Sequence, residues 1–171
     1  MKSSYIVRAQ KFMEMLFPYI CDYIYKPYMV EVAVERFNLI KHRKVRVEHG
    51  SCRIALITSD YVIKWDYSSR GVRNFGGCEN EYEMYQTALE DGYDYLFAAI
   101  TPISINNMIF YCMPRVYGIG DEDRATTWTS DELRYIDDHV NDLHEYNYGF
   151  KSGKTIIIDY ACPRRHYSSY S

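Results

Sequence analysis

The hydrophobic pattern of the chain changes at residues 45–65, VRVEHGSCRIALITSDYVIKW, and the fold class is most readily recognised there. Aliphatic and β-branched residues alternate here with polar ones, and a period of two is typical of strands rather than helices. Residues 49–51 (HGS) and 59–60 (SD) interrupt the alternation with residue types that favour turns. This stretch therefore predicts three short antiparallel strands joined by two turns.

Before this stretch, residues 1–44 show the three-and-four spacing of apolar residues that predicts packing helices. Pro18 is expected to open a second helical segment, since proline favours the first turn of a helix. A further helix is expected over about residues 28–41. Its buried stripe is expected to consist of Val30, Val34, Phe37 and Ile40.

After this stretch, the pattern predicts one helix over residues 80–89 and two strands over 95–105 and 108–116. The dipeptide Asn106-Asn107 is expected to join the two strands. The middle of the chain thus predicts a five-stranded antiparallel sheet with one helix.

Thr129 followed by Glu132 is the pattern of a capping box and predicts the start of another helix. We expect that helix to end near Gly149, and its apolar stripe is expected to consist of Leu133, Ile136, Val140 and Leu143. The β-branched run 155–158 predicts a buried strand that ends at Asp159.

Several polar residues stand out on these expected elements. Lys64 lies inside a strand, and Glu81 lies in the helix that follows. Residues 142–147, DLHEYN, follow the last helix, and the run of isoleucines ends in Asp159. In this order and on these elements, the residues resemble the protein-kinase-like superfamily, including small phage-encoded kinase-like proteins and the aminoglycoside-phosphotransferase branch.

The resemblance covers about residues 45–161 and implies a fold. The expected class is α+β and protein-kinase-like, with the five-stranded sheet, one helix, a reduced helical second lobe and additional N-terminal helices. The chain would divide into an N-terminal helical region (1–44), a kinase-like N-lobe (45–116) and a minimal C-lobe with the catalytic loop and the metal-binding aspartate (117–171).

The resemblance also implies binding of ATP and Mg²⁺. Lys64 would hold the α- and β-phosphates, Glu81 would fix the Lys64 ammonium, and Asp142 would orient or deprotonate the acceptor hydroxyl. Asn147 and Asp159 would supply the hard oxygen ligands that Mg²⁺ prefers. Further nucleotide contacts are implied for Gly50, Ser51 and Met113.

The chain departs from the protein-kinase pattern at several points. The glycine-rich loop is reduced to residues 49–51, and Val140-Asn141 stand where protein kinases have histidine and arginine. Ala161 replaces the glycine of the metal-binding triplet, and twelve residues follow Asp159. We therefore expect no activation segment and no helical platform for a peptide. The motif at 142–147 is closer to the D-L-H-x-x-N form of small-molecule phosphotransferases.

Composition excludes other classes of function. A formal net charge of −3 provides no basic footprint for nucleic acid. We expect no membrane partner, because no run approaches the ~18 apolar residues of a spanning helix. Five scattered cysteines without a C-x-x-C pair are typical of reduced thiols. A cytoplasmic protein is the simplest interpretation, in the host cytoplasm if a phage encodes it.

Three functions remain open. The first is a Mg-ATP-dependent phosphotransferase that modifies a host protein, which the set of Lys64, Glu81, Asp142, Asn147 and Asp159 favours. The second is a catalytically inactive kinase-like module that binds and inhibits a host protein, which the missing activation segment favours. The third is a small-molecule phosphotransferase. Residues 149–155, GFKSGKT, are one residue short of a P-loop and are interpreted as a hairpin turn instead.

Overall fold

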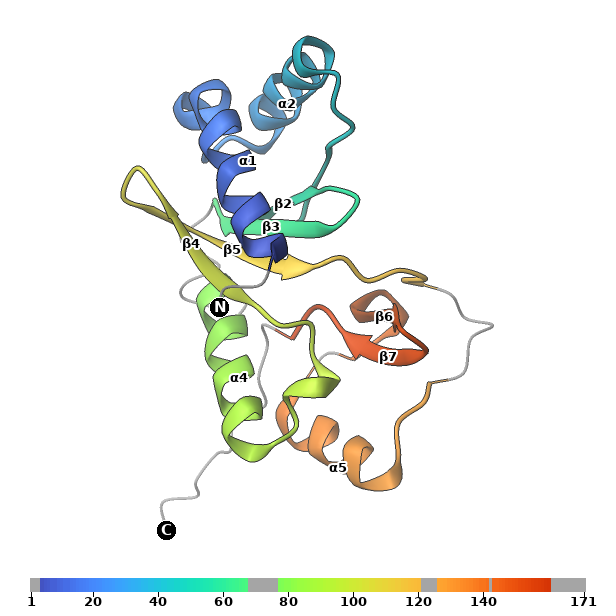
Figure 1. The fold of residues 1–171 in the computed structure, drawn as a ribbon. Coiled ribbons are helices and arrows are strands. Elements are labelled where there is room, and N and C mark those ends of the chain that lie inside the picture. Colours follow the sequence, from blue (N-terminus) through green and yellow to red (C-terminus); the bar gives the residue numbers. More distant parts are fainter. Residues whose placement is uncertain (1–3, 68–76, 121–125, 142, 161–171) are drawn as a thin grey trace.

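The computed structural model describes residues 4–67, 77–120, 126–141 and 143–160, which form an α+β fold (Figure 1). The predicted five-stranded antiparallel sheet is confirmed, with the strand order β1-β2-β3-β5-β4. Its strands are β1 (Arg46–His49), β2 (Arg53–Ile57), β3 (Tyr61–Asp66), β4 (Thr101–Ile105) and β5 (Met108–Pro114). A separate hairpin consists of β6 (Tyr148–Lys151) and β7 (Lys154–Ile157).

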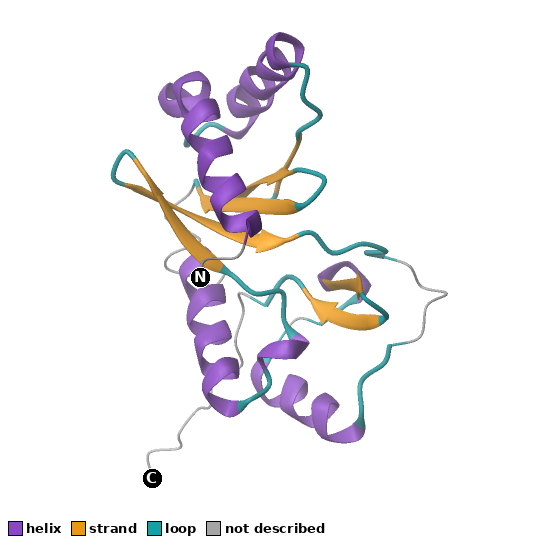
Figure 2. Cartoon of the chain, in the orientation of Figure 1, coloured by secondary structure: helices purple, strands orange, loops and turns teal. Residues whose placement is uncertain are grey.

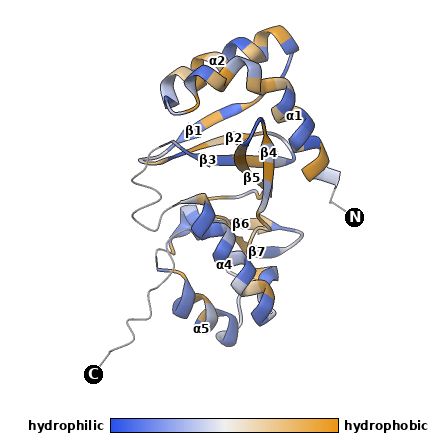
Figure 3. Ribbon diagram, turned by 90° about the vertical axis from the view of Figure 1, so that its left-hand side faces the viewer, coloured by the Kyte–Doolittle hydropathy of each residue, from blue (hydrophilic) through white to orange (hydrophobic). Residues whose placement is uncertain are grey.

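Helices cover both faces of the sheet (Figures 1 and 2). They are α1 (Ser4–Ile20), α2 (Pro27–Lys41), α4 (Cys78–Asp91) and α5 (Ser130–His139), with short 3-10 turns η1 (Cys21–Tyr23), η2 (Asp94–Leu96) and η3 (Glu145–Asn147). The α1–α2 pair lies on one face, while α4, α5 and the β6–β7 hairpin lie on the other (Figures 1 and 3). Among the described helices, none has both the length and the apolar character needed to cross a bilayer.

The first core lies between α1, α2 and one face of the sheet. Alternation along the strands places Ile54 and Leu56 of β2 and Ile63 and Trp65 of β3 in this core, and all four are buried. The Trp65 indole Nε1 donates to the carbonyl of Ile24 at 2.8 Å, which ties the end of the first helical region to β3. The helices of residues 4–41 and the sheet therefore share one core.

The second core lies on the opposite face and contains many tyrosines. Tyr135 and Tyr160 are buried within it. The partly buried tyrosines that pack against it are Tyr82, Tyr85, Tyr93, Tyr111 and Tyr148. The two buried hydroxyls both find acceptors, since Tyr135 donates to Asp91 at 2.9 Å and Tyr160 donates to the Ala98 carbonyl at 2.6 Å. Tyrosine supplies apolar ring area here without leaving its hydroxyl unpaired.

The expected strand from Tyr95 to Ile105 is wrong in its first half. Residues 94–96 form the 3-10 turn η2, and β4 begins only at Thr101. The intervening segment instead crosses to the hairpin, where the Ala98 amide donates to the Ile157 carbonyl at 2.8 Å. Packing against β7, which is distant in sequence, overrides the local strand preference of this segment.

Some helix boundaries and some predicted buried positions also differ from the prediction. Pro18 lies in the last turn of α1 rather than at the start of a new helix. Ile40 of α2 is exposed, whereas Val30, Val34 and Phe37 of the predicted stripe are buried. The helix opened by Thr129 has the predicted capping box but ends at His139, and the extended backbone of Val140 takes the chain out of the helix. Leu133 of its predicted stripe is exposed.

Two of the predicted hairpin turns, at residues 106–107 and 152–153, are confirmed in their backbone geometry. Asn106 and Asn107 both have positive φ, at 48° and 65°, and Ser152 and Gly153 have φ of 52° and 79°. Two successive residues in the left-handed region are typical of a type I′ turn, which matches the twist of antiparallel strands. The segment that approached a P-loop pattern is thus a β-hairpin, with strand rather than helix after the glycine-lysine pair.

Candidate functional site

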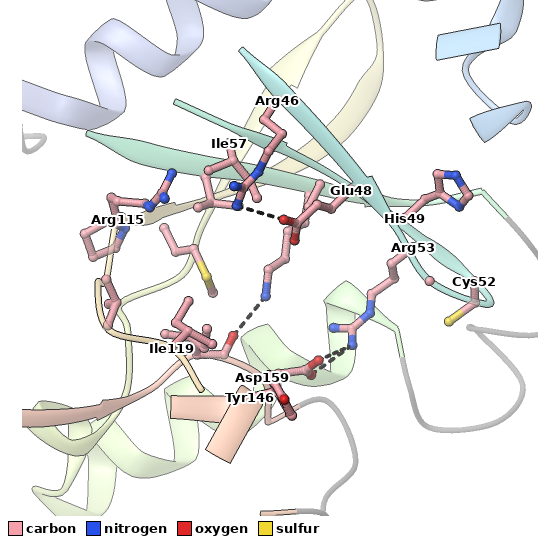
Figure 4. A pocket seen from close by; sticks show the side chains of 18 of the residues that line it. Arg46, Glu48, His49, Cys52, Arg53, Ile57, Arg115, Ile119, Tyr146 and Asp159 are labelled. Atoms are coloured by element: carbon pink, nitrogen blue, oxygen red, sulfur yellow. Dashed lines mark hydrogen bonds and ion pairs between the residues drawn. The ribbon is translucent and has the colours of Figure 1, made fainter. Parts of the chain in front are cut away.

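A cavity of about 580 Å³ lies on the face of the sheet opposite α1, within the size range of small-molecule sites (Figure 4). It is bounded by β1, the turn to β2, β2 itself, β3, the end of β5 with the residues that follow it, and the residues after β7. Its lining residues are Arg46, Glu48, His49, Gly50, Ser51, Cys52, Arg53, Ala55, Ile57, Val62, Lys64, Met113, Pro114, Arg115, Val116, Ile119, Tyr146, Ile158 and Asp159.

The lining is cationic, although the whole chain carries a net charge of −3. Four basic side chains line the cavity, against two carboxylates. The basic ones are Arg46, Arg53, Lys64 and Arg115, and the acidic ones are Glu48 and Asp159. Glu81, which does not line the cavity, pairs with Lys64 from behind, so the site keeps an excess of one positive charge. An excess of fixed positive charge at a concave surface favours an anionic ligand.

Lys64 lies on β3 with its side chain on the cavity face, because its neighbours Ile63 and Trp65 point into the first core. Its Nζ lies 3.2 Å from Glu81 Oε1 and 3.3 Å from Oε2. The same ammonium donates to the Ile158 carbonyl at 2.9 Å. The Lys64 side chain is 13% exposed, so the lysine is a largely buried cation held by three oxygen acceptors.

Glu81 lies in the first turn of α4 and is fully buried, with no exposed side-chain area. Burial raises the pKa of its carboxyl, and the positive charges of Lys64 and Arg53 oppose that rise. The Tyr160 amide also donates to Glu81 Oε1 at 3.4 Å. The structure thus brings together Lys64 and Glu81, the two residues that the resemblance pairs.

Arg53 is the residue that the sequence reasoning missed. Its Nη2 donates to both Asp159 carboxylate oxygens at 2.8 Å, and its Nη1 lies 3.6 Å from Glu81 Oε2. Burial lowers the pKa of Arg53, but the carboxylates of Glu81 and Asp159 outweigh that effect and raise it overall. We call Arg53, Lys64, Glu81 and Asp159 the ion cluster; its two cations and two carboxylates have no net charge.

Strand alternation could have located Arg53. Ala55 pairs with Lys64 across the β2–β3 register, so Arg53, two residues before Ala55, lies on the same face as Lys64. Ala55 itself lines the cavity together with Arg53 and Lys64. The turn signal at residues 49–51 does not include Arg53, which is the first residue of β2.

Backbone hydrogen bonds hold Asn147 beside Asp159. The carbonyl of Asn147 accepts from the amide of Ile158 at 2.8 Å and from that of Asp159 at 3.4 Å. Asn147 is buried at the end of η3, whereas Asp159 lines the cavity. Asp142, the expected catalytic aspartate, lies outside the described residues, as does Ala161.

The three expected nucleotide contacts, Gly50, Ser51 and Met113, all line the cavity. Met113 pairs with Val62 of β3, while the register between β4 and β5 ends at Cys112. Beyond Cys112, one backbone edge of β5 therefore has no sheet partner among the described residues. A backbone edge of this kind can bind the hydrogen-bonding edge of a planar heterocycle.

The oxygen donors present are compatible with Mg²⁺. Asp159 offers a carboxylate to the cavity, and Mg²⁺ usually takes only one or two protein carboxylates together with phosphates and water. Among the described residues, no group of three His, Cys, Asp or Glu side chains comes together as in a site that holds a metal by itself. A cation here would depend on ligand oxygens as well as on Asp159.

No protein-family model matches the chain, and no curated protein matches it closely enough to indicate a family. The residues that line the cavity are therefore the basis for inferring a function.

Proposed function

We propose that the chain binds Mg-ATP in this cavity and transfers the γ-phosphoryl group to a hydroxyl acceptor. The observation that carries the proposal is the Lys64–Glu81 ion pair beside Asp159 at the floor of a cationic cavity. Phosphoryl transfer needs positioning and charge neutralisation more than covalent chemistry, and these residues supply both.

Each residue has a defined part in this proposal. Lys64, held by Glu81, would bind the α- and β-phosphate oxygens, and the free edge of β5 near Met113 would bind the adenine. Asp159, with Asn147 beside it, would hold Mg²⁺, which neutralises phosphate charge when bound.

In the transfer step, the oxygen of the acceptor hydroxyl would bond to the γ-phosphorus while ADP leaves. Asp142 would accept the proton of that hydroxyl. The proposed acceptor is a host protein, in keeping with the resemblance to phage-encoded kinase-like proteins; a small molecule is the other candidate.

Thermal unfolding with and without Mg-ATP tests the site. A ligand at about 100 times its dissociation constant adds about 2.7 kcal/mol to the free energy of unfolding, so wild-type protein should melt at a clearly higher temperature. The Lys64→Met variant should lose this shift. Lys151→Met, at an exposed position of β6 outside the cavity, is the matched control and should keep it.

Transfer itself needs a second measurement. Incubation with γ-labelled ATP and host lysate should label a protein in the presence of wild type but not of Asp159→Asn. A panel of aminoglycosides and other small alcohols distinguishes the small-molecule alternative. Absence of a Mg-ATP shift in wild type, or the same shift in Lys64→Met, would contradict the proposed nucleotide site.

One observation favours a non-catalytic binding module as the second candidate. Both oxygens of Asp159 are held by Arg53, so the carboxylate that would bind metal already has a cationic partner within the protein. A kinase-like module that binds and inhibits a host protein would need no metal at this position. ATP binding without transfer to any acceptor would support this candidate.

A further inference from the structure

The contact between Arg53 and Asp159 involves the same carboxylate that the proposed function assigns to Mg²⁺. Arg53 Nη2 lies 2.8 Å from each oxygen of Asp159 (Figure 4). Two cations cannot share one carboxylate at such a distance without strong mutual repulsion. Arg53 and a metal ion therefore compete for Asp159.

A second observation concerns the other terminal nitrogen of Arg53. Nη1 is buried and donates to no acceptor in the described part of the chain, and its distance of 3.6 Å from Glu81 Oε2 is too long for a hydrogen bond. A buried donor without an acceptor destabilises the arrangement that contains it. A phosphate oxygen in the cavity would provide the missing acceptor.

The two ion pairs of the cluster differ in how easily they can open. Glu81 is fully buried and Lys64 is 13% exposed, so separating them would leave uncompensated charge in the interior. Arg53 is 20% exposed and Asp159 is 38% exposed, so water and ligands can reach their contact. Opening the more exposed pair costs less, because water or a ligand can take the place of the lost partner. The Arg53–Asp159 pair is thus the one that can open.

We propose that Arg53 is a phosphate-binding residue that pairs with Asp159 until a nucleotide enters and then moves onto the nucleotide's phosphates. This inference rests on the proposed function. The guanidinium fork matches phosphate oxygens as well as it matches a carboxylate. Its movement releases Asp159 to the metal and gives Nη1 an acceptor. Arg53 thereby takes the place of the backbone amides that a longer glycine-rich loop would supply.

Titration calorimetry with ATP and with adenosine, each in Mg²⁺ and in EDTA, tests the exchange. In Arg53→Met, ATP affinity in EDTA should fall about tenfold or more, because charge-assisted hydrogen bonds to phosphate are lost. In Mg²⁺ the loss should be smaller, since Asp159 is then available to the metal without displacement of Arg53. Adenosine affinity should not change, because adenosine has no phosphate.

Arg46→Met is the matched control. Arg46 lines the same cavity and carries the same charge, but it pairs with Glu48 on its own strand at 2.8 Å and its side chain is 64% exposed. Its removal should leave the ratio of ATP affinities in Mg²⁺ and EDTA as in wild type. An equal change of that ratio in Arg46→Met and Arg53→Met would assign the effect to net charge and overturn the inference.

Arg53→Lys covers the possibility that Arg53→Met does not fold. It keeps the positive charge but loses the planar fork, so it should fold and show an intermediate loss of ATP affinity in EDTA. The role of Arg53 would be overturned if folded Arg53→Lys, and Arg53→Met if it folds, kept the wild-type ratio of ATP affinities in Mg²⁺ and EDTA. The proposed nucleotide site would remain intact in that case. If the wild-type protein binds ATP neither in Mg²⁺ nor in EDTA, both the proposed function and this inference are overturned.

Discussion

The Tyr160 hydroxyl donates a hydrogen bond to the backbone carbonyl of Ala98 at 2.6 Å, although 62 residues separate them. The Tyr160 ring is buried and packs edge-on against Phe97 with a centroid distance of 4.9 Å. Burial raises the pKa of this hydroxyl well above its ordinary value, which keeps it a donor at neutral pH. Since Tyr160 directly follows Asp159, this contact anchors the segment that carries the cavity carboxylate.

Tyr160→Phe removes only the donor of this hydrogen bond. The Ala98 carbonyl is then left without that partner in the core, so the free energy of unfolding should fall by about 1–2 kcal/mol. Urea unfolding followed by circular dichroism measures this. Tyr25→Phe, at an exposed position, should unfold at the same urea concentration as wild type. Equal stability of Tyr160→Phe and wild type would contradict an anchoring role for the hydroxyl.

Glu81→Gln tests whether the buried carboxylate is ionised and paired. Replacing one partner of a buried ion pair leaves the Lys64 ammonium uncompensated, so stability should fall by about 3 kcal/mol or more at neutral pH. Glu83→Gln lies on the same helix at an exposed position and should change stability by less than about 0.5 kcal/mol. If Glu81→Gln costs as little as Glu83→Gln, Glu81 is protonated in the folded protein and the ion cluster is not neutral.

Gly149 allows β6 to approach the segment that borders the cavity. A Cβ atom at this position would lie 2.6 Å from the Tyr117 carbonyl oxygen and 2.7 Å from Val116 Cγ1. Gly149→Ala should therefore push the hairpin away from residues 116–119 and destabilise the fold by about 1–3 kcal/mol. A thermal melt measures the loss.

Gly50→Ala is the contrasting substitution. A Cβ atom at Gly50 would meet nothing within 4 Å, and Gly50 does not have positive φ. The melting temperature of Gly50→Ala should therefore match that of wild type or exceed it slightly. A loss as large as that of Gly149→Ala would contradict the open space around Gly50.

The capping box of α5 gives a pH dependence. The Thr129 amide donates to the Glu132 carboxylate at 2.6 Å, and this hydrogen bond holds the pKa of Glu132 below its ordinary value. A carboxyl with a lowered folded-state pKa stabilises the fold above its unfolded-state pKa, and this contribution is lost as pH falls through the folded-state value. The stability difference between wild type and Glu132→Gln should therefore be largest near neutral pH and should shrink in acid.

Thr129→Ala removes the reciprocal hydrogen bond, in which the Thr129 hydroxyl accepts from the Glu132 amide at 3.3 Å. The expected loss is about 1 kcal/mol, typical of an N-cap threonine. Denaturant unfolding at several pH values measures both variants. A pH-independent difference between wild type and Glu132→Gln would contradict the role of the ionised carboxylate.

Local signals predicted most of the regular structure. The strands around residues 45–65, the asparagine turn at 106–107 and the start of α5 follow from alternation, turn chemistry and a capping box, all of which act between near neighbours. The start of β4 and the end of α5 were wrong because contacts with the hairpin and the second core decide where these elements begin and end.

The five-stranded sheet and the face of β3 on which Lys64 lies follow from the residue pattern alone, because strand alternation leaves Lys64 no place in the apolar first core. The pairing of Arg53 with Asp159 could not be predicted in this way, since 106 residues separate them and the contact depends on tertiary packing around the cavity. A bond across such a distance in sequence depends on the packing of whole elements, which no local pattern of residues encodes.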